Sequence, residues 1–213
     1  MNFGDIQNKV ADYLNRTDLS TQIKDAINMA QRKLERQYNF NYMQVRTITS
    51  TSDNYISVPM GYYSGATFIS APYKEVIHFK VKSGDTYYNL IREDEKIVMK
   101  DNKTGLPKYF CYLPNQTEFL VYPTPDKEYS FDLLFYRYSP TLTETTDTNY
   151  LTDYAPEILI YGALCELEPI LMNDKRVILW KSLFQEALEG LRTAEEGEVS
   201  SGSVILPKSN FTV

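Results

Sequence analysis

Apolar residues recur every three or four positions at both ends of the chain and every second position in its middle. At the N-terminal end this spacing predicts a helix over residues 3–15 and a second helix that ends near Tyr38. At the C-terminal end, residues 153–196 predict two further helices, separated at Asn173-Asp174. The last of these carries the clearest apolar stripe, at Val177, Trp180, Phe184, Ala187, Leu188 and Leu191.

Residues suited to helix starts stand close to these boundaries. Thr17 or Asp18 is placed to cap the second helix, and Asp153 to cap the third, with Pro156 in its first turn. Asp174 is placed to cap the fourth helix. Gly190 is unfavourable in the last turns of that helix.

The middle of the chain shows the two-residue period of β-strands. Residues 76–81 and 86–91 predict a hairpin around a turn at residues 82–85. Segments 109–113, 119–122 and 129–138 predict a three-stranded meander. The last strand is apolar on both faces, so we expect helices, a second sheet or a neighbouring subunit to cover both.

These elements predict an α+β fold in which two helical hairpins form a four-helix bundle around an inserted antiparallel β domain. Each hairpin has one apolar stripe to cover, and packing the two stripes together is the simplest solution. The predicted parts are an N-terminal hairpin (1–40), the β domain (41–142), a C-terminal hairpin (143–196) and a flexible C-terminal arm (197–213).

Charge and composition narrow the possible functions. The chain has 22 Lys+Arg against 28 Asp+Glu, a net charge of −6, which argues against a surface that grips nucleic-acid phosphates. The negative charge is compatible with a protein along which DNA moves without binding. Basic and aromatic residues do alternate at Lys108-Tyr109 and Tyr136-Arg137-Tyr138, so an OB-like nucleic-acid binder stays an alternative. No apolar run reaches 18 residues, so we expect no membrane contact.

The sequence offers few residues for catalysis. His78 has no nearby histidine or cysteine to complete a metal site, and no phosphate-binding or nucleophile motif is present. Cys111 and Cys165 are far apart and are expected to be buried thiols. Neighbouring acids such as Glu93-Asp94-Glu95 are expected to be solvated. We therefore predict no enzyme activity, no catalytic residues, no cofactor and no metal.

The arm after Glu196 contains one apolar peptide within a Gly- and Ser-rich segment. It is expected either to fray or to order on a partner as an added strand or hydrophobic plug. The candidate residues for binding a partner or a neighbouring subunit are Val204, Ile205, Leu206, Pro207 and Phe211 in the arm, with Trp180 in the last helix.

Four short patterns, in this order, resemble the head-to-tail adaptor (head-completion) proteins of short-tailed, podovirus-type bacteriophages. A "Y-P-x-P-D" turn is similar to residues 122–126, and a "Y-x-x-P" strand end to residues 136–140. A helix opening "Y-A-P-x-x-L-x-Y-G-A-L" is similar to residues 154–164, and a "W-x-x-x-F/Y-x-x-A/E-L" segment to residues 180–188.

The resemblance implies a structural virion protein that assembles in the host cytoplasm and lies at the head–tail interface. It implies a ring, usually of twelve copies, bound under the portal protein. Such a ring extends the DNA channel and offers a platform to tail or nozzle proteins, while genomic DNA passes without sequence-specific binding. The acidic balance suggests that the channel wall is negative.

Two other functions remain open. The protein could be a different virion component with a bundle and a β insert, such as a neck or tail-tube protein. It could also be a cell-wall hydrolase, an activity credited to one member of the resembled family in another phage group, but no residues here suggest where that activity would lie.

Overall fold

The chain forms two compact units, a helical unit of residues 1–42 and 140–213 and a β unit of residues 43–139. Each unit has its own core and is described here by itself. The computed structural model describes residues 1–51, 57–59, 61–64, 67–70, 73–98, 103–112, 118–172 and 175–200.

Helix α1 (Phe3–Leu14) begins with a capping box, as its sequence allows. The Asn2 side chain accepts a hydrogen bond from the Asp5 backbone N–H, and the Asp5 carboxylate accepts one from the Asn2 N–H. The helix ends at Asn15, whose backbone is left-handed with φ of 53°. Its apolar stripe is buried, which confirms the predicted helix.

Helix α2 (Ser20–Gln37) ends at Tyr38 as predicted, but its predicted cap is wrong. The N-cap position is Leu19, which makes no side-chain capping bond. Asp18 instead accepts two hydrogen bonds of 2.6 Å from the Arg16 guanidinium. That nearby cation competes successfully for the carboxylate.

The third predicted helix is divided into α4 (Tyr150–Tyr154), α5 (Pro156–Glu166) and α6 (Glu168–Leu171). Asn149 caps α4 through a capping box with Thr152, and Ala155 is the N-cap of α5. Asp153 therefore caps no helix, contrary to prediction, because an additional short helix precedes Pro156. Pro156 does open α5, as predicted.

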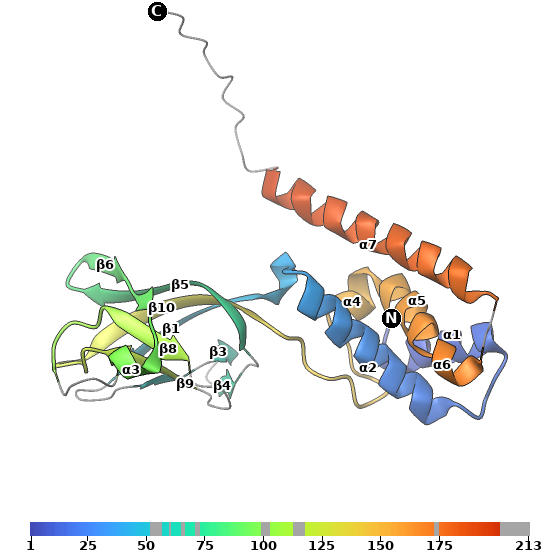
Figure 1. Cartoon of the computed structure of the whole chain (residues 1–213), viewed down its shortest axis with the longest axis horizontal. Coiled ribbons are helices and arrows are strands. Elements are labelled where there is room, and N and C mark those ends of the chain that lie inside the picture. The colour runs from blue at the N-terminus through green and yellow to red at the C-terminus, as the bar shows by residue number, and fades with distance from the viewer. Residues whose placement is uncertain are drawn as a thin grey trace, which may run out of the picture. The chain divides into compact units, whose positions relative to one another are not determined.

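Helix α7 (Val177–Ser200) is longer than predicted and continues through Gly190. The predicted cap, Asp174, lies outside the described residues. Figure 1 shows α7 running along the helical unit, where it packs on α5. Helix α5 also packs against α1 and α2, so it lies at the centre of this unit. The predicted four-helix bundle is not confirmed and stays a prediction.

The β unit contains two four-stranded sheets and a small hairpin (Figure 1). Sheet A has the order β1-β10-β5-β6 and is antiparallel, and sheet B has the order β2-β9-β8-β7 with β7 parallel to β8. The hairpin is β3-β4. The strands are β1 (Gln44–Thr51), β2 (Ser57–Pro59), β3 (Gly61–Ser64), β4 (Thr67–Ser70), β5 (Tyr73–Ser83), β6 (Thr86–Asn89), β7 (Ile91–Arg92), β8 (Tyr109–Tyr112), β9 (Glu118–Tyr122) and β10 (Tyr129–Arg137), and the unit also holds a short helix, α3 (Glu95–Val98).

Sheets A and B share one aromatic core. Phe79 of sheet A lies 5.1 Å from Phe110 and 5.5 Å from Phe119 of sheet B, measured between ring centroids. In β10 the alternate residues Tyr129, Phe131, Leu133 and Phe135 are buried in this core. The fold is therefore α+β with mainly antiparallel sheets.

The predicted hairpin is confirmed as β5-β6, and Gly84 occupies its turn with φ of 62°. The predicted meander is wrong in its last step. Strands β8 and β9 pair, but β10 pairs with β1 and β5 in the other sheet. The apolar inner face of β10 is covered by sheet B across the core, which is one of the covers that we expected.

Candidate interaction site on the helical unit

The single histidine belongs to a charged cluster on the outer face of sheet A. Arg46 donates hydrogen bonds of 2.9 and 2.8 Å to the two carboxylate oxygens of Asp132. Nε2 of His78 lies 3.8 Å from Asp132 Oδ1. The Arg46 hydrogen bonds hold the pKa of Asp132 below its ordinary value, although burial opposes this. Both oxygens of Asp132 are thus held by Arg46, which indicates a structural ion pair.

Neither cysteine is arranged for catalysis. Cys111 is buried and Cys165 is half-buried, and both are free thiols. Burial raises the pKa of each thiol, which disfavours the nucleophilic thiolate. Within the described part of the chain, no group of three or more His, Cys, Asp or Glu side chains could hold a metal ion.

A groove of about 660 Å³ opens in the helical unit between α4, α5 and α7. We call it the α5–α7 groove. Helices α4 and α5 contribute tyrosine rings and the exposed Glu157, and α7 contributes small side chains and the exposed Glu186. The residues that define it here are Tyr150, Tyr154, Tyr161, Ala187, Gly190 and Ala194.

The groove is open partly because α7 has a glycine where a side chain would project. A Cβ atom built at Gly190 would meet nothing within 4 Å. Gly162 of α5 is the opposite case, because a Cβ there would lie 2.9 Å from the Ala30 Cβ and 3.3 Å from Cε2 of Phe184. Gly162 therefore allows α2, α5 and α7 to approach closely, whereas Gly190 leaves space.

A chain of aromatic rings leads from the end of α2 into the groove. Successive centroids are 5.8 Å apart for Tyr38 and Phe40, 5.5 Å for Phe40 and Tyr42, and 4.5 Å for Tyr42 and Tyr150. Tyr150 then lies 4.9 Å from Tyr154. Tyr154 is 74% exposed, so the chain ends in an aromatic side chain available to a partner.

Two buried acids lie where α2 and α7 come close to this row of aromatic rings. Glu35 is fully buried and Glu195 is 9% exposed. Oε1 of Glu195 accepts a 2.9 Å hydrogen bond from the Asn41 backbone N–H. Burial, with the nearby charges of Glu35 and Glu195, raises the pKa of Tyr42 well above its ordinary value. The Glu195–Asn41 hydrogen bond joins the C-terminal half of α7 to the segment that follows α2.

Four large apolar side chains are exposed near the end of α6 and the start of α7. These side chains are between 49% and 85% exposed, and they are close together in sequence. Monomeric proteins seldom leave several large apolar side chains together in water, so the surface suits a protein contact. We call it the α6–α7 patch, and it consists of Ile170, Met172, Ile178 and Leu179.

Comparison with known families agrees with an interaction protein. A family model described as SU10 adaptor protein matches residues 1–206. The chain belongs to the SU10 adaptor protein family. It is therefore a structural adaptor of the phage virion neck, which interacts with other phage head and tail proteins. A search of curated proteins found no match.

Of the six predicted binding residues of this adaptor, the structure describes one, Trp180. Trp180 is 5% exposed, and the Arg176 guanidinium lies 5.0 Å from its ring centroid, so little of the indole is available to a partner. The arm residues Val204, Ile205, Leu206, Pro207 and Phe211 lie outside the described residues. No helix in the described part of the adaptor is long and apolar enough to cross a membrane.

Sequence reasoning missed Tyr154 and the α5–α7 groove. One signal was present, because Gly190 stands inside a predicted helix that continues past it. A glycine kept inside a long helix indicates a close approach or a space, and only the fold distinguishes the two. The α6–α7 patch was missed because Ile178 and Leu179 lie between the stripe positions Val177 and Trp180, and apolar spacing does not show whether such side chains are covered.

Proposed function

We propose that this protein is a head-to-tail adaptor of a short-tailed, podovirus-type phage. It forms a ring, of twelve subunits by the family resemblance, bound under the portal protein. The ring extends the DNA channel and offers an attachment platform to tail or nozzle proteins. The observation that carries the proposal is the family match over residues 1–206.

The exposed surfaces support a ring. A closed ring needs two different patches on each subunit, one of which meets the other on the next copy. The α6–α7 patch and the α5–α7 groove are two such surfaces on the helical unit. We retain the four-helix bundle as the proposed packing of this unit in the ring.

The distribution of charge supports a DNA channel that does not bind its cargo. The helical unit contains 11 of the 22 Lys and Arg residues and 17 of the 28 Asp and Glu residues, a net charge of −6. The β unit contains 11 of each, so its net charge is zero. We propose that the helical unit faces the channel, where negative charge repels phosphates. A lumen lined mainly by Lys and Arg would overturn this part of the proposal.

Assembly in the host cytoplasm and a place in the finished neck follow from this role. The proposal includes no catalysis, since the ion pair of Asp132 and Arg46 and the raised pKa values of the thiols suit structure. Clearing of a peptidoglycan gel by the purified protein would contradict it and favour a cell-wall hydrolase.

Native mass measurement of the protein, alone and with purified portal rings, tests the function. We expect a complex whose added mass equals a whole ring of adaptor subunits. Electron microscopy of the same mixture should show added density on one end of the portal. Rings or tubes that form without portal and never bind it would favour the alternative, a different neck or tail-tube component.

A further inference from the structure

We propose that the α5–α7 groove of each subunit receives the C-terminal segment Val204–Lys208 of the neighbouring copy. The inference rests on the proposed ring and specifies one contact within it. Its starting point is a groove of about 660 Å³ that presents tyrosine rings and two carboxylates, with no described segment of the chain seated in it. That volume is within the range of about 300–1,000 Å³ found for binding pockets.

The chemistry of the segment matches the groove. Val204, Ile205, Leu206 and Pro207 provide four apolar side chains, and Lys208 follows with a positive charge. The groove offers the exposed ring of Tyr154 for apolar contact. Glu157 and Glu186, both exposed, offer the opposite charge. Pro207 favours an extended conformation at Leu206, which suits a strand-like peptide lying along a groove.

Chain length limits how far the segment can extend from the end of α7. When extended, the chain places Val204 at most roughly 13 Å and Lys208 at most roughly 26 Å from Ser200, at about 3.3 Å per residue. Gly190 lies ten residues before Ser200, which is about 15 Å along the helix.

Symmetry favours the neighbouring copy as the donor. A ring needs a contact between two different surfaces of the subunit. The arm and the groove are two such surfaces. Each subunit would give one arm and accept one, so the contact repeats around the ring without leaving a groove empty. Linking subunits through extended arms would add affinity without a large rigid interface.

Photocrosslinking in the assembled ring tests the proposal. The full-length protein would carry benzoylphenylalanine at position 205 and would be mixed with an equal amount of ¹⁵N-labelled protein before assembly on portal rings. We expect mixed-isotope crosslinks between position 205 and peptides that contain Tyr154 or Gly190. Crosslinks only within one copy, or only to portal, would overturn the inference.

Two glycine variants provide a matched comparison. Gly190→Leu fills the groove, and its Cβ meets nothing within 4 Å, so the helix should tolerate it. Gly197→Leu makes the same change on the same helix outside the groove, also with nothing within 4 Å of the new Cβ. We expect Gly190→Leu to reduce the crosslink yield at least tenfold and Gly197→Leu to leave it unchanged. Equal yields from the two variants would contradict the proposal.

The mass measurement separates this inference from the proposed function. Rings that form on portal without crosslinks to the groove would exclude the arm contact and leave the adaptor function intact. Failure of the wild-type protein to form any complex with portal would instead count against the function itself. Charge reversal adds a further check, because Glu186→Lys should weaken crosslinking and Lys208→Glu in the same chain should restore it.

Discussion

At the scale of single residues, the burial of a charged side chain decides how much its ion pair contributes to stability. Asp18 and Asp132 each accept two hydrogen bonds from one arginine. Asp18 is exposed, and its pair with Arg16 is weakened by solvent. The side chain of Asp132 is only 7% exposed, so its carboxylate depends on Arg46. The two pairs make the same kind of hydrogen bonds but differ in burial, and so in their expected effect on stability.

We expect Asp132→Ala to lower the free energy of unfolding by about 1.5–3 kcal/mol at pH 7, the range for hydrogen bonds to charged groups. Asp18→Ala is the control and should leave the unfolding midpoint unchanged. Because the folded-state pKa of Asp132 is depressed, its contribution is present above the ordinary value near 3.8 and is lost as pH falls through the lower folded value. Urea unfolding at pH 7 and pH 2.5 should therefore show the wild type and Asp132→Ala converging at low pH.

At the scale of secondary-structure elements, two glycines in neighbouring helices have opposite roles. Gly162 lies where α5 meets Ala30 of α2 and Phe184 of α7. Gly190 lies on α7 where the helical unit leaves a groove. Helix propensity penalises both by the same amount relative to alanine, so only packing can explain why they should respond differently.

Gly162→Ala should destabilise the helical unit by about 1–3 kcal/mol, because the new Cβ would lie within 2.9 Å of the Ala30 Cβ. Gly190→Ala should instead stabilise it by up to about 1 kcal/mol through helix propensity. Thermal unfolding followed by circular dichroism measures both. Ala30→Gly in the Gly162→Ala background should recover part of the loss. If both single variants shift the unfolding temperature in the same direction, the helices that pack at Gly162 can move apart to accept a new Cβ atom.

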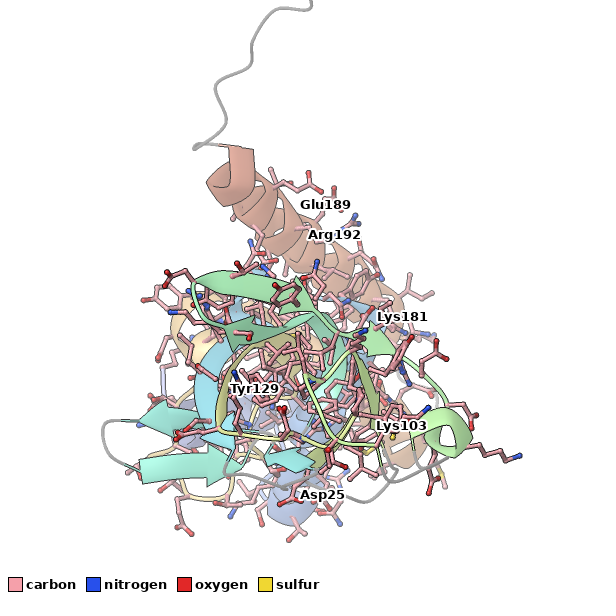
Figure 2. All side chains as sticks on the ribbon, turned by 90° about the vertical axis from the view of Figure 1, so that its left-hand side faces the viewer. Asp25, Lys103, Tyr129, Lys181, Glu189 and Arg192 are labelled. Carbon is pink, nitrogen blue, oxygen red and sulfur yellow. The ribbon has the colours of Figure 1, made fainter. Side chains whose placement is uncertain are left out.

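At the scale of the whole molecule, net charge is unevenly divided between the two units. The net charge of −6 lies entirely in the helical unit. Helix α7 illustrates this surface with the exposed Glu189, whose carboxylate lies 3.5 Å from the Arg192 guanidinium (Figure 2). The same unit holds the α5–α7 groove and the α6–α7 patch. Its surfaces therefore suit contacts with proteins and repel nucleic acid.

We expect the assembled ring to show no measurable affinity for short duplex DNA at about 150 mM salt, because the helical unit repels phosphates. Glu189→Lys with Glu196→Lys changes two exposed acids per subunit and should create binding that weakens steeply as salt rises. Fluorescence anisotropy of labelled DNA measures both rings. Salt-sensitive binding by the wild-type ring would contradict the proposed channel.

The sequence by itself determined where the long helices lie and where the chain changes from helices to strands. The spacing of apolar residues identified α1, α2 and the β5-β6 hairpin, because periodicity follows from local backbone geometry. It also identified the apolar stripe of α7, although α7 extends past Gly190 to Ser200.

Only the tertiary structure decided which elements meet. The partners of β10, the central position of α5 and the opposite roles of Gly162 and Gly190 depend on residues far apart in the chain. Apolar periodicity shows on which face of a helix or strand a side chain lies. It does not show which other part of the protein covers that face. For the same reason, Trp180 lies in the core while Tyr154 is exposed, although their sequence contexts do not distinguish an anchor from a core residue.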